Sequence, residues 1–256
     1  MQTSYPLTPE ALKLGEFTKA GGLKSVGTFT SEEEVVVGRM VQRGTSDNSC
    51  ERLKTGLTTK QLGIVVESNE RPIDGDTTLA NAFAAEKAIS VAELTDGITV
   101  LVDQNVTTGD AVYARICSTK NVQTIAFDRD FENLNVIAWS VDGVNQTSIT
   151  YATSHAATIA ALAAAIEATQ PVYTCTAATR TLTITSENAD QPLFVFTVTL
   201  GANQAVDAAP VTTTAGVEGD QGVLRADSDS GKAVLVSNAK FKTSGSPGEL
   251  VELSIV

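Results

Sequence analysis

Few residues of this chain have the types and spacing that enzyme chemistry requires. His155 is the only histidine among the 256 residues, so a Ser-His-Asp or Cys-His arrangement has a single candidate base. It begins a predicted helix, where the helix dipole disfavours a charged imidazole, and we expect a surface or capping role. The cysteines Cys50, Cys117 and Cys175 are too few and too scattered for a disulfide framework, which suggests buried thiols in a reducing cytoplasm.

Patterns for binding metal ions and phosphate are equally weak. The segment Asp227-Ser-Asp229-Ser-Gly231 opens like a calcium loop, but its twelfth position is Asn238 instead of glutamate, so we interpret it as a charged turn. The sequence contains no HExxH, no paired Cys/His ligands and no GxGxxG. The 30 acidic residues offer accidental carboxylate pairs, yet Trp139 is the only tryptophan available as a sugar platform. We therefore expect a protein that is not an enzyme and that has no catalytic residues, no metal ligands and no cofactor.

Composition limits the partners of the chain. Its net charge of −12 argues against nucleic acid and against anionic membranes, because both are bound through clustered Lys and Arg. No hydrophobic stretch follows Met1, so we expect no signal peptide. The longest apolar run, 156–165, is about half of what a bilayer span needs. A hydrophobic share of 42% with only 5% aromatic residues predicts a core of Val, Ile, Leu and Ala.

A Val-rich pattern of short strands runs from Val35 to Phe127 and resumes after residue 220. Alternation and β-branched residues predict the strands, and Asp96-Gly97 predicts a tight hairpin between two of them. We therefore expect a mainly β protein, a small β-barrel or sandwich, built from residues 35–127 and 220–256. The predicted strands are Val35–Val41, Leu62–Glu67, Ala88–Leu94, Ile98–Val102, Ala111–Ile116, Gly222–Ala226, Lys232–Val236 and Glu249–Ile255.

A second domain interrupts this pattern. Residues 135–206 predict an inserted α+β domain of order ββαβββ, flanked by linkers at 128–134 and 207–219. Its helix is expected over 155–168, with Ser154 or Thr153 as the cap. Ile159, Leu162, Ala163 and Ile166 form one apolar stripe on that helix. The predicted strands are Val136–Val141, Val144–Tyr151, Val172–Thr176, Thr181–Thr185 and Leu193–Leu200.

Residues 1–34 are predicted to form an extended N-terminal arm. Large apolar residues are widely spaced on a polar segment there, as a segment that docks on another subunit requires. The acidic run 32–34 is interpreted as a solvated face. The candidate contact residues of the arm are Tyr5, Leu7, Leu12, Leu14, Phe17, Leu23 and Phe29.

Several stretches of the sequence resemble the decoration, or cement, proteins of tailed-phage capsids. In chain order they read MQTSYP, VVVGRMVQRGT, LGIVVESN, ISVAELTDGITVLVDQNVTTGDAVYARI and AKFKTSGSPGELVELSIV. The last stretch has Pro247 where that family more usually has Ala. The resemblance covers about 130 residues and the arm, and the order of the pieces makes it more specific than any one of them.

The resemblance implies a β-barrel protein that binds the outside of an icosahedral shell and stabilises it, often as a trimer. Its partners are then the major capsid protein and itself, with no nucleic acid and no membrane. Its location is the capsid exterior of the virion, after synthesis in the host cytoplasm. The insert, with its Ala-rich TIAALAAAIEA helix, resembles small domains of phage structural proteins and is expected to project outward.

Three other functions stay open at this point. The chain could be an accessory subunit of a tail or baseplate, which microscopy of particles distinguishes from a capsid protein. It could be a module that binds a host surface or a glycan through the insert. A hydrolase using scattered carboxylates is the third, and the absence of a second histidine or a ligand cluster argues against it.

Overall fold

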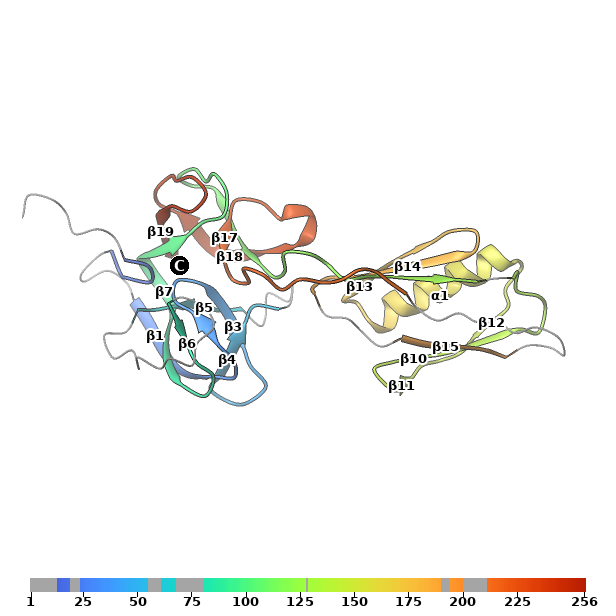
Figure 1. Cartoon of the computed structure of the whole chain (residues 1–256). Helices are drawn as coiled ribbons and strands as arrows, with labels where there is room; N and C mark the ends of the chain where they lie inside the picture. The colour runs from blue at the N-terminus through green and yellow to red at the C-terminus, as the bar shows by residue number, and fades with distance from the viewer. Residues whose placement is uncertain are drawn as a thin grey trace, which may run out of the picture. The chain divides into compact units, whose positions relative to one another are not determined.

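Two compact units make up the computed structural model of this chain (Figure 1), which describes residues 13–18, 24–54, 61–67, 81–127, 129–189, 194–199 and 211–256. Unit 1 contains residues 1–116 and 220–256, and unit 2 contains residues 117–219. Unit 2 thus interrupts unit 1 in the sequence. Among the described residues, no helix is long and apolar enough to cross a membrane.

Unit 1 is a closed β-barrel with an extension. Its nine-stranded sheet has the order β1-β4-β3-β5-β7-β19-β18-β8-β17, and β1 also pairs with β7. This second pairing closes β1, β4, β3, β5 and β7 into a ring of five strands. The expectation of a mainly β barrel is confirmed. The strands are β1 (Lys24–Ser31), β2 (Val35–Val36), β3 (Met40–Arg43), β4 (Ser49–Arg52), β5 (Gln61–Val65), β6 (Ala82–Phe83), β7 (Ala88–Leu101), β8 (Ala111–Arg115), β17 (Leu224–Arg225), β18 (Ala233–Phe241) and β19 (Leu250–Ile255).

The hairpin predicted at Asp96-Gly97 is wrong, because β7 runs through both residues as one strand of 14 residues. A Cβ atom at Gly97 would lie 2.2 Å from Thr18 Oγ1 and 2.3 Å from a Glu252 carboxylate oxygen. Glycine is therefore needed at this position because neighbouring chain segments approach closely, and not because the chain turns. At this point β7 changes partners, since both its pairing with β1 and its pairing with β19 reach Thr95.

The barrel interior consists mainly of aliphatic side chains, as the low aromatic share predicts. Side chains alternate along the strands between the barrel interior and its outer surface. Strands favour β-branched residues because their stiff side chains pack well on a pleated surface. The cluster of buried residues is completed by two phenylalanines, one of them Phe29 of β1. Its members are Phe29, Val35, Val37, Val41, Cys50, Leu62, Val65, Phe83, Ile89 and Val91.

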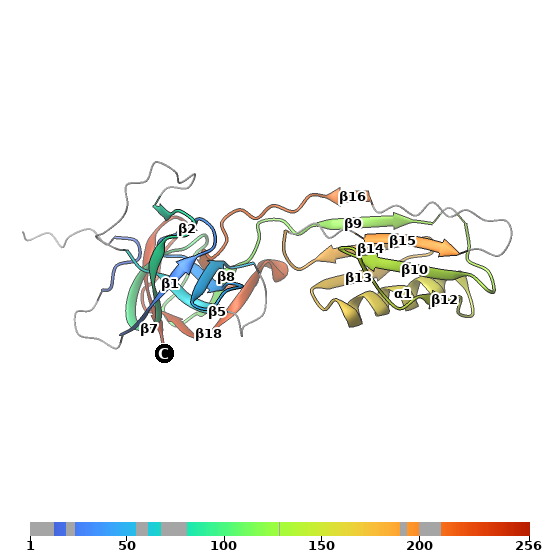
Figure 2. The same cartoon turned by 90° about the horizontal axis from the view of Figure 1, so that it is seen from below.

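In its described residues, unit 2 consists of two four-stranded sheets and one helix. In one sheet β10 pairs with β11, β12 and β15, and the other sheet has the order β13-β14-β9-β16. Figure 2 shows β9 next to β16 in the second sheet. The elements are β9 (Val122–Ala126), β10 (Val136–Val141), β11 (Val144–Asn145), β12 (Ile149–Thr150), α1 (His155–Thr169), β13 (Tyr173–Ala177), β14 (Thr181–Ser186), β15 (Phe194–Thr199) and β16 (Val211–Thr214).

Two boundaries of this unit differ from the sequence-based ones. Strand β9, expected in the barrel, pairs with β14 and β16 of unit 2. Strand β16 lies in the segment expected to be a linker. The strand expected over 144–151 is two short strands, β11 and β12, which pair with opposite ends of β10.

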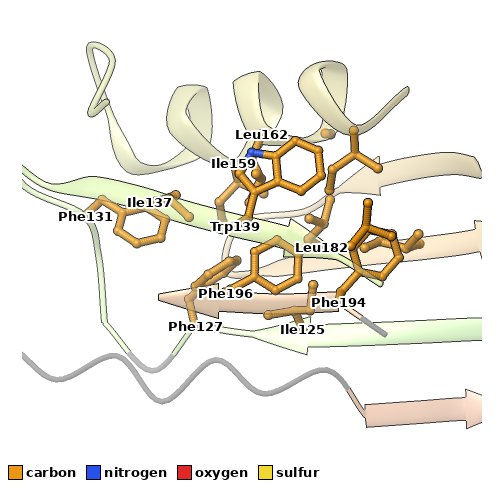
Figure 3. Packing of buried hydrophobic residues seen from close by; sticks show 14 residues of the cluster. Ile125, Phe127, Phe131, Ile137, Trp139, Ile159, Leu162, Leu182, Phe194 and Phe196 are labelled. Atoms are coloured by element: carbon orange, nitrogen blue, oxygen red, sulfur yellow. The ribbon is translucent and has the colours of Figure 1, made fainter. Parts of the chain in front are cut away.

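One apolar core joins the two sheets and the helix of unit 2 (Figure 3). The stripe of α1 faces this core, with Ile159, Leu162 and Ile166 fully buried. Ser154 caps the helix, since its hydroxyl accepts a hydrogen bond from the Ala157 amide. Trp139 of β10 is buried beside the stripe and its indole N–H donates to the Thr147 carbonyl at 3.0 Å. This shared core holds the two sheets and the helix of unit 2 together.

Candidate interaction surface at the N-terminal segment

Residues 13–18, here called the root segment, attach the N-terminal part of the chain to the barrel. The Gly15 amide donates to the Thr99 carbonyl at 2.8 Å, and the Thr99 amide donates to the Glu16 carbonyl at 2.9 Å. The Glu67 amide donates to the Gly15 carbonyl at 3.1 Å. The root segment thus runs along β7 as a short extra strand, and Phe17 forms an antiparallel bridge with Ile98.

Gly15 permits this close approach. Its φ is +72°, and a Cβ atom there would lie 2.4 Å from Val37 Cγ1 and 2.9 Å from the Glu67 nitrogen. A side chain would therefore push the root segment off the barrel.

The structure places only some of the seven candidate contact residues. Leu14 is half-buried and packs against the barrel core. Phe17 is half-buried, and the Lys24 ammonium lies 4.5 Å from the centre of its ring. Tyr5, Leu7, Leu12 and Leu23 lie outside the described residues.

Phe29 differs from the expectation for an arm residue. It belongs to β1, and only 7% of its surface is exposed. Because it fills the barrel, it is not available to another subunit. The arm expected to extend to residue 34 must also be shortened, since β1 begins at Lys24 and closes the ring.

The acidic run at 32–34 is not simply a solvated face. The Glu32 carboxylate accepts hydrogen bonds from the Ser49 hydroxyl, from the Ser46 amide at 2.9 Å and from the Thr45 amide at 2.7 Å. These bonds, the one from Ser49 foremost, lower the pKa of Glu32 to about 2. Glu32 therefore holds the loop between β3 and β4 in one conformation.

Glu33 holds the strand that follows this loop. Its carboxylate accepts from the Arg52 guanidinium at 2.8 Å and lies 2.9 Å from the Lys54 ammonium. Burial alone raises the pKa of Glu33, but the hydrogen bonds from Arg52 and Lys54 outweigh burial and lower it. Sequence reasoning missed both roles, because the partners lie 13 to 21 residues away and only the fold brings them together.

The acidic turn at 227–231 binds arginines. The Asp229 carboxylate lies 2.9 Å from the Arg115 guanidinium and 3.0 Å from that of Arg225. Arg115 also pairs with Asp103. In the part of the chain that the structure describes, no group of three or more His, Cys, Asp or Glu side chains could hold a metal ion.

His155 has a structural position and neither the surface position nor the capping role expected, since Ser154 caps the helix. It is buried, its Nδ1 accepts from the Phe131 amide at 2.8 Å, and its ring packs on that of Phe131. Burial lowers the pKa of His155. Burial also raises the pKa values of Cys50 and Cys175 to about 12, which disfavours the thiolates that nucleophilic catalysis needs.

Comparison with known proteins identifies the family of this chain. No curated protein matches the chain. A solved chain from Mycobacterium phage Patience matches at 19% identity over 96% of this chain and 97% of that chain, with a TM-score of 0.28. The family described as "Structural cement protein (E217 gp24/Pam3 gp6)" matches residues 1–165, well over half of the chain. The chain therefore belongs to the phage structural cement protein family.

Proposed function

We propose that this protein binds the outer surface of a tailed-phage capsid as a trimer, with the major capsid protein as its partner. Membership of the cement family carries the proposal, because it gives the chain a structural, capsid-stabilising role in the virion. The insert projects away from the shell. No step of this function requires catalysis.

The root segment supports a contact made by residues 1–12. Leu14 and Phe17 hold the root segment on the barrel, so we assign the shell contact to the apolar candidates that precede the root segment, Tyr5, Leu7 and Leu12. Burying three such side chains contributes several kcal/mol at about 25 cal/mol per Å², less the cost of ordering the segment. A second contact between the rigid barrel and the shell increases the overall affinity for the shell, because the arm of a protein already bound through its barrel binds at high effective concentration.

Shells that lack this protein provide the test. Variant Δ1–12 keeps the root segment and β1, so it should fold and melt as the full chain does. We expect it to lose most of its binding in co-sedimentation with shells. Equal binding by Δ1–12 and the full chain would rule out the arm as a shell contact.

A matched variant controls for the removal of residues. Replacing 117–219 with a short Gly/Ser linker removes unit 2 and leaves the arm and barrel intact. This variant should bind shells as well as the full chain does. Microscopy of decorated particles then locates the protein, and density along the tail with none on the shell would contradict the capsid function.

A further inference from the structure

His155 attaches the connection between the two sheets of unit 2 to the start of α1. This connection leads from β9 in one sheet to β10 in the other. On it, the Phe131 amide donates a hydrogen bond of 2.8 Å to His155 Nδ1. The imidazole ring also packs against the rings of Phe127 and Phe131, whose centroids lie 6.2 and 4.7 Å away. We call these interactions of His155 with Phe127 and Phe131 the His155 contact.

The hydrogen bond in this contact fixes the protonation state of the ring. A neutral imidazole has one nitrogen that accepts and one that donates, whereas a charged imidazole donates from both. Because Nδ1 accepts from the Phe131 amide, it carries no proton. A proton on Nδ1 would set two N–H donors against each other, and both are buried. A protonated His155 therefore loses this bond and leaves the Phe131 amide without its acceptor.

The surroundings of the ring also oppose a positive charge. His155 is 8% exposed, and burial is the largest cause of its lowered pKa. Among the described residues, Asp130 lies 4.0 Å from Nε2 and favours the charged form, as does the backbone of Thr179. Arg180 disfavours it and itself pairs with Asp130 at 2.9 Å. The first turn of α1 has no acidic residue, and its dipole disfavours a cation.

We propose that the His155 contact is an acid-sensitive switch, which releases the connection between β9 and β10 from α1 when the ring gains a proton. The pKa of His155 in folded unit 2 lies below the ordinary histidine value of 6.5. Below pH 6.5 the unfolded chain therefore binds more protons than the folded chain, and unit 2 loses stability as the pH falls toward the folded pKa. Below the folded pKa the loss stops growing, because both states are then protonated. This switch lies within unit 2 and does not depend on binding to a shell.

The sequence makes the switch easy to measure, because unit 2 contains the only histidine and the only tryptophan of the chain. In the full chain, an NMR titration of the single imidazole measures the pKa of His155 directly. We expect a midpoint below pH 6.5, because burial and the bond from the Phe131 amide both oppose the proton. A midpoint at or above 6.5 would overturn the proposal.

Two substitutions separate the imidazole from the carboxylates that also titrate in acid. His155→Asn keeps a side-chain oxygen as an acceptor for the Phe131 amide, and His155→Phe keeps an aromatic ring without an acceptor. Neither side chain titrates. Trp139 is buried in the core of unit 2, so its fluorescence in urea reports the unfolding of this unit.

The pH dependence of unfolding should then differ between the three proteins. From pH 6.5 down to the folded pKa of His155, the unfolding equilibrium constant of the unsubstituted chain should rise by up to about tenfold per pH unit relative to that of each variant. The same pH dependence in all three would refute the role of the imidazole. If a variant does not fold, the titration of the unsubstituted chain still decides.

Hydrogen exchange shows where the chain opens. After correction for the intrinsic pH dependence of exchange, the Phe131 amide should lose more protection in acid than the amides of β14, a strand that is paired on both sides. In His155→Asn the two should keep the same ratio at every pH. An equal loss over the whole of unit 2 would mean that the proton destabilises the unit without releasing this connection, and the switch would be wrong.

Discussion

Ile125→Ala distinguishes the division of the chain seen in the structure from the one that the sequence suggests. Ile125 lies on β9, which the sequence pattern assigns to the barrel. In the structure its side chain is fully buried in the core of unit 2. The substitution should therefore destabilise unit 2 and leave the barrel unchanged. Ile98→Ala is the counterpart, since Ile98 is fully buried in unit 1.

The size of the effect follows from burial and unit size. Removing a fully buried isoleucine side chain down to alanine costs about 3 kcal/mol. Unit 2 has about 100 residues, and its entropy of unfolding is about 0.2 kcal/mol per kelvin. The melting temperature of unit 2 should fall by about 14 °C. For the larger unit 1, Ile98→Ala should lower the melting temperature by about 9 °C.

Differential scanning calorimetry of the full chain resolves the two units as two transitions. Each substitution should shift one transition, and the shifted transition should differ between the two variants. The variant that lacks 117–219 shows only the barrel transition, so it identifies which of the two transitions of the full chain belongs to the barrel. If Ile125→Ala moves the barrel transition, or if both variants move both transitions equally, the division into units is wrong.

Three further predictions follow from the same contacts. Deleting 130–217 in place of 117–219 should give an aggregating protein, because the deletion leaves the apolar face of β9 without its core. Gel filtration of both deletion variants measures aggregation. If the two variants were equally soluble, the prediction would be wrong. Glu32 has a lowered folded pKa of about 2, so its stabilising effect is present above its ordinary pKa of 4.5 and disappears as the pH falls toward 2. The urea midpoints of the unsubstituted chain and Glu32→Gln should therefore differ at neutral pH and converge in acid, and a constant difference would refute the role of the carboxylate. Gly97→Ala should displace Thr18 and speed hydrogen exchange of the root-segment amides; unchanged exchange would show that the close approach is not required.

The sequence predicts the strands of the barrel well where alternation and β-branched residues coincide. β5 and β8 lie within a residue or two of their expected positions, because a strand with one face in a core must alternate. The partner of a strand has no such local signal. β9 has the composition of a barrel strand, and its membership of unit 2 depends on pairing with residues about 60 and 90 positions later.

The candidate site was harder to predict than the fold. Apolar residues on a polar segment form the same pattern whether they bind another subunit or their own barrel, so the sequence alone groups Phe29 with the arm residues. Asp96-Gly97 has the composition of a turn, and only the positions of Thr18 and Glu252 explain why glycine is needed in a continuous strand. Both cases depend on contacts between distant parts of the chain.

The closed ring has a consequence for the order in which the chain folds during synthesis. Its five strands all lie between Lys24 and Leu101, so the ribosome has synthesised all five before it adds any residue of unit 2. β18 and β19 emerge only after unit 2, and their docking closes a loop of about 100 residues, which costs about 3 kcal/mol more than closing a tight one. Folded unit 2 removes most of this cost, because the Ser118 amide donates to the Val217 carbonyl at 2.9 Å and holds its two ends together. The nascent chain should thus form the ring first, unit 2 second and the C-terminal strands last.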